Sequence, residues 1–97
     1  MAQLDPIIHA PNRLRICALL SPIHEAEFQF LREQLDVSES VLSKQISQLV
    51  DVGYVQIRKK VSLGRSRKWA ALTASGRQAF ESHAAALKQI VALAEGA

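Results

Sequence analysis

The sequence predicts one small domain of mainly α (α+β) class, spanning residues 1–97, in which three short helices precede a β-hairpin and one long helix. Three patterns predict this order. Proline, glycine and capping residues divide the first half into helix-length units, residues 55–61 alternate between two sets of side chains, and residues 74–94 continue as one helix. A chain of 97 residues can enclose one core, which argues against most enzyme architectures.

The composition is that of a folded protein from a reducing compartment. Hydrophobic residues make up 48% of the chain and charged residues 22%, as in ordinary globular domains. Cys17 is the single cysteine, so it can form neither an intramolecular disulfide nor a thiolate metal site alone. No apolar run is long enough for a membrane span, and Asp5 and Pro6 interrupt any signal-peptide pattern. We therefore expect a cytoplasmic protein with no membrane partner.

The first two helices are placed by the prolines around them. A helix is predicted over 13–20, between Pro11 and Pro22, and a second helix over 29–35. Residues 23–28 have mixed character and could form a short strand between them. The expected inward side chains are Leu14, Ile16, Cys17, Leu20, Phe30, Leu31 and Leu35.

The third helix has the clearest boundaries. Ser38 is a good N-cap, and Val37 before it can pack against Leu42. The helix is predicted to run to Asp51, and Gly53 lies where a left-handed residue would close it. The expected inward face consists of Leu42, Ile46, Leu49 and Val50.

The opposite face of this helix is polar and made of small residues, namely Ser40, Ser43, Lys44, Ser47 and Gln48. Short hydroxyl side chains around one cation and one amide allow close approach to a groove and can donate to phosphates and base edges. A surface helix without a binding role is the simpler interpretation of this face taken alone.

The second half of the chain predicts a hairpin and a long helix. Val55, Ile57, Lys59 and Val61 alternate with polar residues, which predicts a strand with one buried face. Residues 62–66 supply the turn, and the second strand runs over 67–72. Thr73 is then expected to cap the last helix, over 74–94.

Charge is distributed unevenly along the chain. The formal net charge is +3, but residues 52–80 contain seven cations and no acid, whereas residues 1–51 contain four cations and seven acids. A basic block of this kind is expected where one surface meets a polyanion. A solvated basic face that serves solubility is the alternative.

Two runs carry a family resemblance. The run LREQLDVSESVLSKQISQLVDVGYVQIR over 31–58, followed by GRSRKWAALTASGR over 64–77, resembles the helix-turn-helix and wing of MarR-like winged-helix transcriptional regulators. The preceding run LDPIIHAPNRLRICALL is similar to the first helices of short, stand-alone members. One departure is Asp36, since glycine is common in the turn before the third helix, but aspartate tolerates a left-handed backbone better than most residues.

The resemblance implies a winged helix-turn-helix fold with a two- to three-stranded wing, and a sequence-specific regulator, most simply a repressor, that binds double-stranded DNA. The recognition helix 38–51 would enter the major groove, and the wing 58–68 would lie on the backbone or minor groove. The residues expected to contact DNA are Ser38, Ser40, Ser43, Lys44, Ser47, Gln48, Arg58, Lys60, Arg65, Arg67 and Lys68.

The last helix predicts a homodimer. Its polar residues after Phe80 are confined to a narrow strip, so the apolar arc is wider than one domain needs to cover. A helix well buried in a monomer is the alternative, but so short a chain has little material to surround it. The residues expected at the dimer interface are Ile7, Ile8, Phe80, His83, Leu87, Ile90, Val91 and Ala94.

No pattern points to catalysis or to a cofactor. The histidines have no metal-ligand spacing, Cys17 is favoured as a small buried hydrophobe over a redox switch, and no nucleophile elbow or phosphate loop is present. The short chain also argues against a cleft for a small-molecule effector. A winged helix used as a protein-interaction or RNA-binding module is the alternative function.

Overall fold

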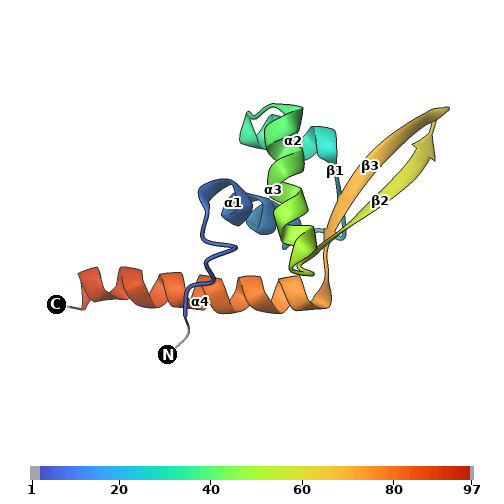
Figure 1. The fold of residues 1–97 in the computed structure, drawn as a ribbon. Helices are drawn as coiled ribbons and strands as arrows, with labels where there is room; N and C mark the ends of the chain where they lie inside the picture. The colour runs from blue at the N-terminus through green and yellow to red at the C-terminus, as the bar shows by residue number, and fades with distance from the viewer. Residues whose placement is uncertain (1–2, 97) are drawn as a thin grey trace.

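The computed structural model describes residues 3–96. Helices α1, α2 and α3 form one cluster, α4 runs along one side of it, and the β2–β3 hairpin extends away from the helices (Figure 1). The strands form one antiparallel sheet in the order β1-β3-β2. The predicted winged-helix arrangement is confirmed. In chain order, the elements are α1 (Pro11–Leu20), β1 (Ala26–Glu27), α2 (Phe28–Leu35), α3 (Glu39–Asp51), β2 (Val55–Ser62), β3 (Arg65–Leu72) and α4 (Ala74–Glu95).

Side-chain caps begin two of the helices as predicted. Ser38 Oγ accepts a hydrogen bond from the Val41 N–H at 3.2 Å, which satisfies one of the free donors at the start of α3. Thr73 Oγ1 accepts one from the Gly76 N–H at 2.9 Å at the start of α4. These caps fix where α3 and α4 begin through contacts within three residues.

Left-handed residues end α2 and redirect the chain after α3. Asp36 has a φ of 53°, so aspartate does occupy the left-handed position in the turn between α2 and α3. Gly53 has a φ of 79°, and the adjacent Tyr54 N–H donates to the carbonyl of Leu49 at 2.9 Å. The chain therefore leaves α3 in a defined direction and enters β2 directly.

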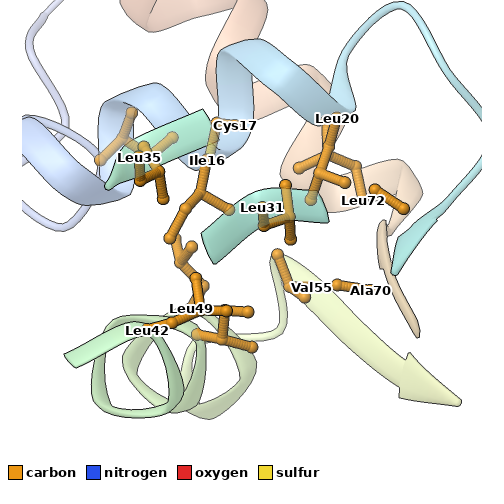
Figure 2. Close-up of a cluster of buried hydrophobic side chains, with 13 residues drawn as sticks. Ile16, Cys17, Leu20, Leu31, Leu35, Leu42, Leu49, Val55, Ala70 and Leu72 are labelled. Atoms are coloured by element: carbon orange, nitrogen blue, oxygen red, sulfur yellow. The ribbon is translucent and has the colours of Figure 1, made fainter. Parts of the chain in front are cut away.

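The core lies where α1, α2 and α3 meet the base of the sheet (Figure 2). Its buried side chains come from every element of this junction: Ile16, Cys17 and Leu20 from α1, Leu31 and Leu35 from α2, Leu42, Ile46 and Leu49 from α3, and Val55, Ala70 and Leu72 from the strands. Leu14 and Val37 are half-buried against this cluster. Burial on one side of α3 leaves its other side free.

Two inward assignments were wrong. Phe30 is 41% exposed, because α2 begins at Phe28 and its inward spacing runs through Phe28, Leu31 and Leu35. Val50 is 36% exposed, because it lies at the edge of the inward arc of α3 rather than near its centre.

The hairpin differs from the predicted half-buried strand. Only Val55 of β2 is buried, whereas Ile57 is 41% and Val61 is 78% exposed, because the hairpin leaves the helices after its first residues (Figure 1). The turn is also shorter than predicted. Residues 62 and 65 are paired, so Leu63 and Gly64 form a two-residue turn. Both have positive φ, as the favoured type of tight hairpin turn requires.

Candidate nucleic-acid interface

The outward face of α3 is the first part of the candidate interface. Ser40, Lys44 and Ser47 are exposed on the side opposite the buried leucines and isoleucine of the same helix, and Ser43 is half-buried on the flank. Small hydroxyls around Lys44 leave room for a polyanion to approach the backbone. This part of the predicted set is brought together as one surface.

Two residues of the predicted set have structural contacts of their own. Ser38 caps α3, and its Oγ lies 3.2 Å from the Ser40 Oγ. Gln48 is half-buried, and its Oε1 accepts a hydrogen bond from Nη1 of Arg13 on α1, which also donates to Gln45 Oε1 at 2.8 Å. The side-chain oxygen of Gln48 is thus committed to holding α3 against α1.

The wing supplies the second part. Arg58, Lys60, Arg65 and Lys68 are exposed and Arg67 is half-buried. Two of these cations, Lys60 and Arg67, are in ion pairs with carboxylates at or next to β1. Lys60 pairs with Glu25, and Arg67 Nη1 lies 2.6 Å from Glu27 Oε1. The hydrogen bond from Lys60 is the main lowering influence on the pKa of Glu25, which lies below its usual value despite an opposing desolvation effect. These two glutamates were missed by sequence reasoning, although their i, i+2 spacing is that of one strand face.

A hollow of about 330 Å³ separates the wing from the helices. Lys68 Nζ lies 5.8 Å from the centre of the Phe28 ring at one wall. The residues that line the hollow come from the start of α2, the start of α3 and the free edge of β3: Glu27, Phe28, Gln29, Glu39, Arg65, Ser66, Arg67 and Lys68. The start of α3 and the basic wing therefore border one shared concavity.

The residues predicted for a dimer interface divide into two groups. Ile8 and His83 are fully buried inside the protomer, so neither can contact a second copy directly, which corrects that assignment. Ile7, Phe80 and Leu87 are half-buried, and Ile7 and Phe80 pack against the core. Ile90, Val91 and Ala94 are exposed in the last turns of α4.

His83 belongs to a polar network that sequence reasoning missed. Its Nδ1 accepts a hydrogen bond from the Asp5 N–H at 2.9 Å, and its Nε2 lies 3.3 Å from Nδ1 of His9. Burial, and to a lesser extent the nearby His9, lowers the pKa of His83 and so favours the neutral imidazole. Asp5 also accepts from the Tyr54 hydroxyl at 2.6 Å, so the network joins the N-terminal segment, α4 and the entrance to β2.

Cys17 has the structural role that the sequence favoured. The side chain is fully buried, and burial raises the pKa of its thiol to about 11. Within residues 3–96, no group of three or more His, Cys, Asp or Glu side chains could hold a metal ion. No helix in the same range is long and apolar enough to cross a membrane.

Comparison with known proteins gives consistent results. A family model described as a winged helix DNA-binding domain matches residues 12–91. An uncharacterized protein from Methanocaldococcus jannaschii is 31% identical over 77 residues, which cover 79% of this chain and 84% of that protein.

Solved structures match with the same fold. A transcriptional regulator homologue from Pyrococcus horikoshii OT3 is 28% identical with a TM-score of 0.82, over 88% of this chain and 84% of that chain. A MarR-family transcriptional regulator structure from Enterococcus faecalis V583 has the same TM-score at 18% identity, over 93% of this chain and 81% of that chain. These structural neighbours are transcriptional regulators and not enzymes.

Proposed function

The chain belongs to the winged helix DNA-binding domain family, and we propose that it is a cytoplasmic, sequence-specific regulator that binds double-stranded DNA as a homodimer, most simply as a repressor. The observation that carries this proposal is the position of the exposed Ser40, Lys44 and Ser47 face of α3 beside the basic wing. A rigid helix face with donors suits a major groove, while the flanking cations suit phosphates or a minor groove.

The two parts of the interface have different proposed roles. Lys44 lies at the centre of the exposed arc of α3, where an ammonium group can reach guanine O6 or N7. The wing residues over 58–68 project from a hairpin that is exposed on both faces, which suits non-specific phosphate contacts. Sequence preference is therefore assigned to α3 and salt-dependent affinity to the wing.

Selection of bound fragments from genomic DNA with purified protein tests this proposal, followed by binding isotherms on the preferred duplex and on random-sequence DNA. Lys44→Ala should cost about 1–3 kcal/mol on the preferred duplex and less on random DNA. Lys88→Ala on α4 is the matched control, since it removes the same charge from an exposed site outside the interface. Failure of the wild-type protein to bind duplex DNA would favour the protein-interaction or RNA-binding alternative.

The homodimer rests on the end of α4. Ile90, Val91 and Leu93 are 48%, 58% and 71% exposed, on a helix that extends beyond the rest of the protomer (Figure 1). An apolar helix end of this kind is suited to packing against a second copy, which would place two recognition helices on a pseudo-palindromic site.

Sedimentation velocity at micromolar concentrations tests the dimer. Val91→Lys places a charge on a side chain that the protomer leaves exposed, so it should dissociate the dimer without unfolding the domain. Gln89→Lys, on an exposed polar position of the same turn, is the control. A monomeric wild-type protein at tens of micromolar would disprove the assembly.

A further inference from the structure

The register of the hairpin places cations directly opposite one another in two pairs. Lys60 is paired with Arg67, and Lys59 with Lys68. Directly opposite residues of an antiparallel pair point to the same face, and successive pairs point to opposite faces. One face of the wing therefore holds the pair Lys59 and Lys68. The other face holds the pair Lys60 and Arg67 and, beside it, the exposed Arg58 and Arg65. Directly opposite like charges repel each other unless a counter-charge is near.

The two pairs have different surroundings. Glu25 and Glu27 contact Lys60 and Arg67, and Lys60 Nζ also lies 5.0 Å from the centre of the Trp69 ring. The two positive charges of this first pair are balanced by the two negative charges of the glutamates. Lys59 and Lys68 have no carboxylate within ion-pair distance among the described residues, and Lys68 contacts the Phe28 ring instead.

The two glutamates are partly shielded from solvent, with side chains that are 16% and 24% exposed. Glu27 is paired with Trp69 of β3, and Glu25 lies directly before β1. If a phosphate drew Lys60 or Arg67 aside, a half-buried carboxylate would be left near the phosphate without its partner. The ion pairs therefore weaken phosphate binding by Lys60 and Arg67, whether they stay intact or are broken.

We propose that Glu25 and Glu27 neutralise Lys60 and Arg67, so that Lys59 and Lys68 are the cross-strand pair of the wing that binds DNA phosphates. This assignment rests on the proposed DNA-binding function and refines it, because Lys59 joins the interface while Lys60 and Arg67 contribute little net charge. Lys59 and Lys68 lie on the continuation of the sheet face that holds Val55 and Leu72, which faces the helices.

The salt dependence of binding to a random-sequence duplex tests the assignment, because the slope of log affinity against log salt counts neutralised phosphates. Lys59→Gln with Lys68→Gln should lower the magnitude of this slope by about two per subunit and weaken binding at least tenfold. Replacing both ion pairs together, with Glu25→Gln, Glu27→Gln, Lys60→Gln and Arg67→Gln in one variant, should change the affinity by less than about threefold, because the net charge of these four side chains is unchanged.

The decisive comparison removes the two carboxylates alone. Glu25→Gln with Glu27→Gln should strengthen binding and steepen the slope by up to about two per subunit, and adding Lys60→Gln with Arg67→Gln should then reverse that gain. Glu81→Gln on α4, which removes one exposed carboxylate away from the wing, should have little effect. Circular dichroism melts confirm that each variant is folded under the binding conditions.

Three outcomes would overturn the assignment. A loss in the variant that lacks both ion pairs equal to that of Lys59→Gln with Lys68→Gln would show that Lys60 and Arg67 bind phosphates despite the glutamates. An unchanged slope in the glutamate variant would show that the glutamates do not neutralise Lys60 and Arg67. Absence of binding by the wild-type protein to any duplex would overturn the proposed function itself, and the assignment with it.

Discussion

Helix α3 and the β2–β3 hairpin follow one another in the chain and share the proposed interface, yet they are held by different forces. Leu42, Ile46 and Leu49 anchor α3 in the core with at most 1% exposure. All residues of β2 after Val55 are exposed. The hairpin is held by the backbone hydrogen bonds between its strands, by the buried residues at its start and by two ion pairs. The two elements of the proposed interface are thus held by different contacts, so core changes and charge changes should have separable effects.

The joint between the two elements is defined by backbone contacts. The Tyr54 N–H donates to the Leu49 carbonyl, and the Thr73 N–H donates to the Tyr54 carbonyl at 3.0 Å. Thr73 Oγ1 also donates to the Gly53 carbonyl at 2.6 Å. The start of α4 therefore fixes the angle at which the hairpin leaves α3.

Truncation in the anchored face of α3 should have the largest effect. Ile46→Ala removes a fully buried side chain, and we expect the free energy of unfolding to fall by about 2–5 kcal/mol. Val61→Ala in the hairpin alters a side chain that is 78% exposed, so it should change the free energy of unfolding by less than about 0.5 kcal/mol. Urea unfolding at one protein concentration compares them, and equal losses would contradict the contrast between the two elements.

A substitution at the joint should come next. In Gly76→Ala the new Cβ would lie 2.0 Å from the Tyr54 carbonyl oxygen, a backbone atom that cannot rotate away. We expect a loss of about 3 kcal/mol, although alanine normally stabilises a helix relative to glycine by about 0.5–1 kcal/mol. Thermal and urea unfolding measure the loss, with the exposed Ser75→Ala as control. A stabilised Gly76→Ala protein would show that this close contact is absent.

Acid should loosen the network behind the joint. Burial lowers the pKa of His83 in the folded protein. Below the ordinary value of 6.5, the unfolded chain therefore binds a proton at this histidine more readily than the folded chain does. Stability is therefore fully present above pH 6.5 and falls as the pH drops towards the folded pKa. His83→Asn can keep an acceptor for the Asp5 N–H and should flatten this part of the pH profile. An unchanged profile from chemical unfolding would contradict the buried neutral imidazole.

The smallest effect is expected at the tip of the hairpin, and it should be a gain. Leu63 is 99% exposed with a φ of 53°, a left-handed conformation that leucine disfavours and asparagine tolerates. Leu63→Asn should raise the free energy of unfolding by about 0.5–1 kcal/mol, since no packing is lost. Leu63→Ala removes the same apolar group without favouring the left-handed backbone, so it should give no gain. A destabilised Leu63→Asn protein would disprove this interpretation.

Local chemistry made much of the fold predictable. The caps at Ser38 and Thr73, the left-handed Gly53 and the inward face of Leu42, Ile46 and Leu49 depend on residues within a few positions of one another, so the sequence contains their physical cause. The basic wing was likewise visible as a block of charge, and the exposed serine and lysine face of α3 followed from the helical period.

The tertiary structure decided what covers each face and which charges are neutralised. Alternation in β2 predicted a buried face. The hairpin instead extends beyond the helices, so Ile57 and Val61 have no core to pack against and are exposed. The Lys60–Glu25 contact spans 35 positions and the Asp5–His83 contact spans 78, so both depend on how the short β1 strand and the N-terminal segment pack. Sequence periodicity describes one element at a time, whereas burial and ion pairing arise between elements that only the folded chain brings together.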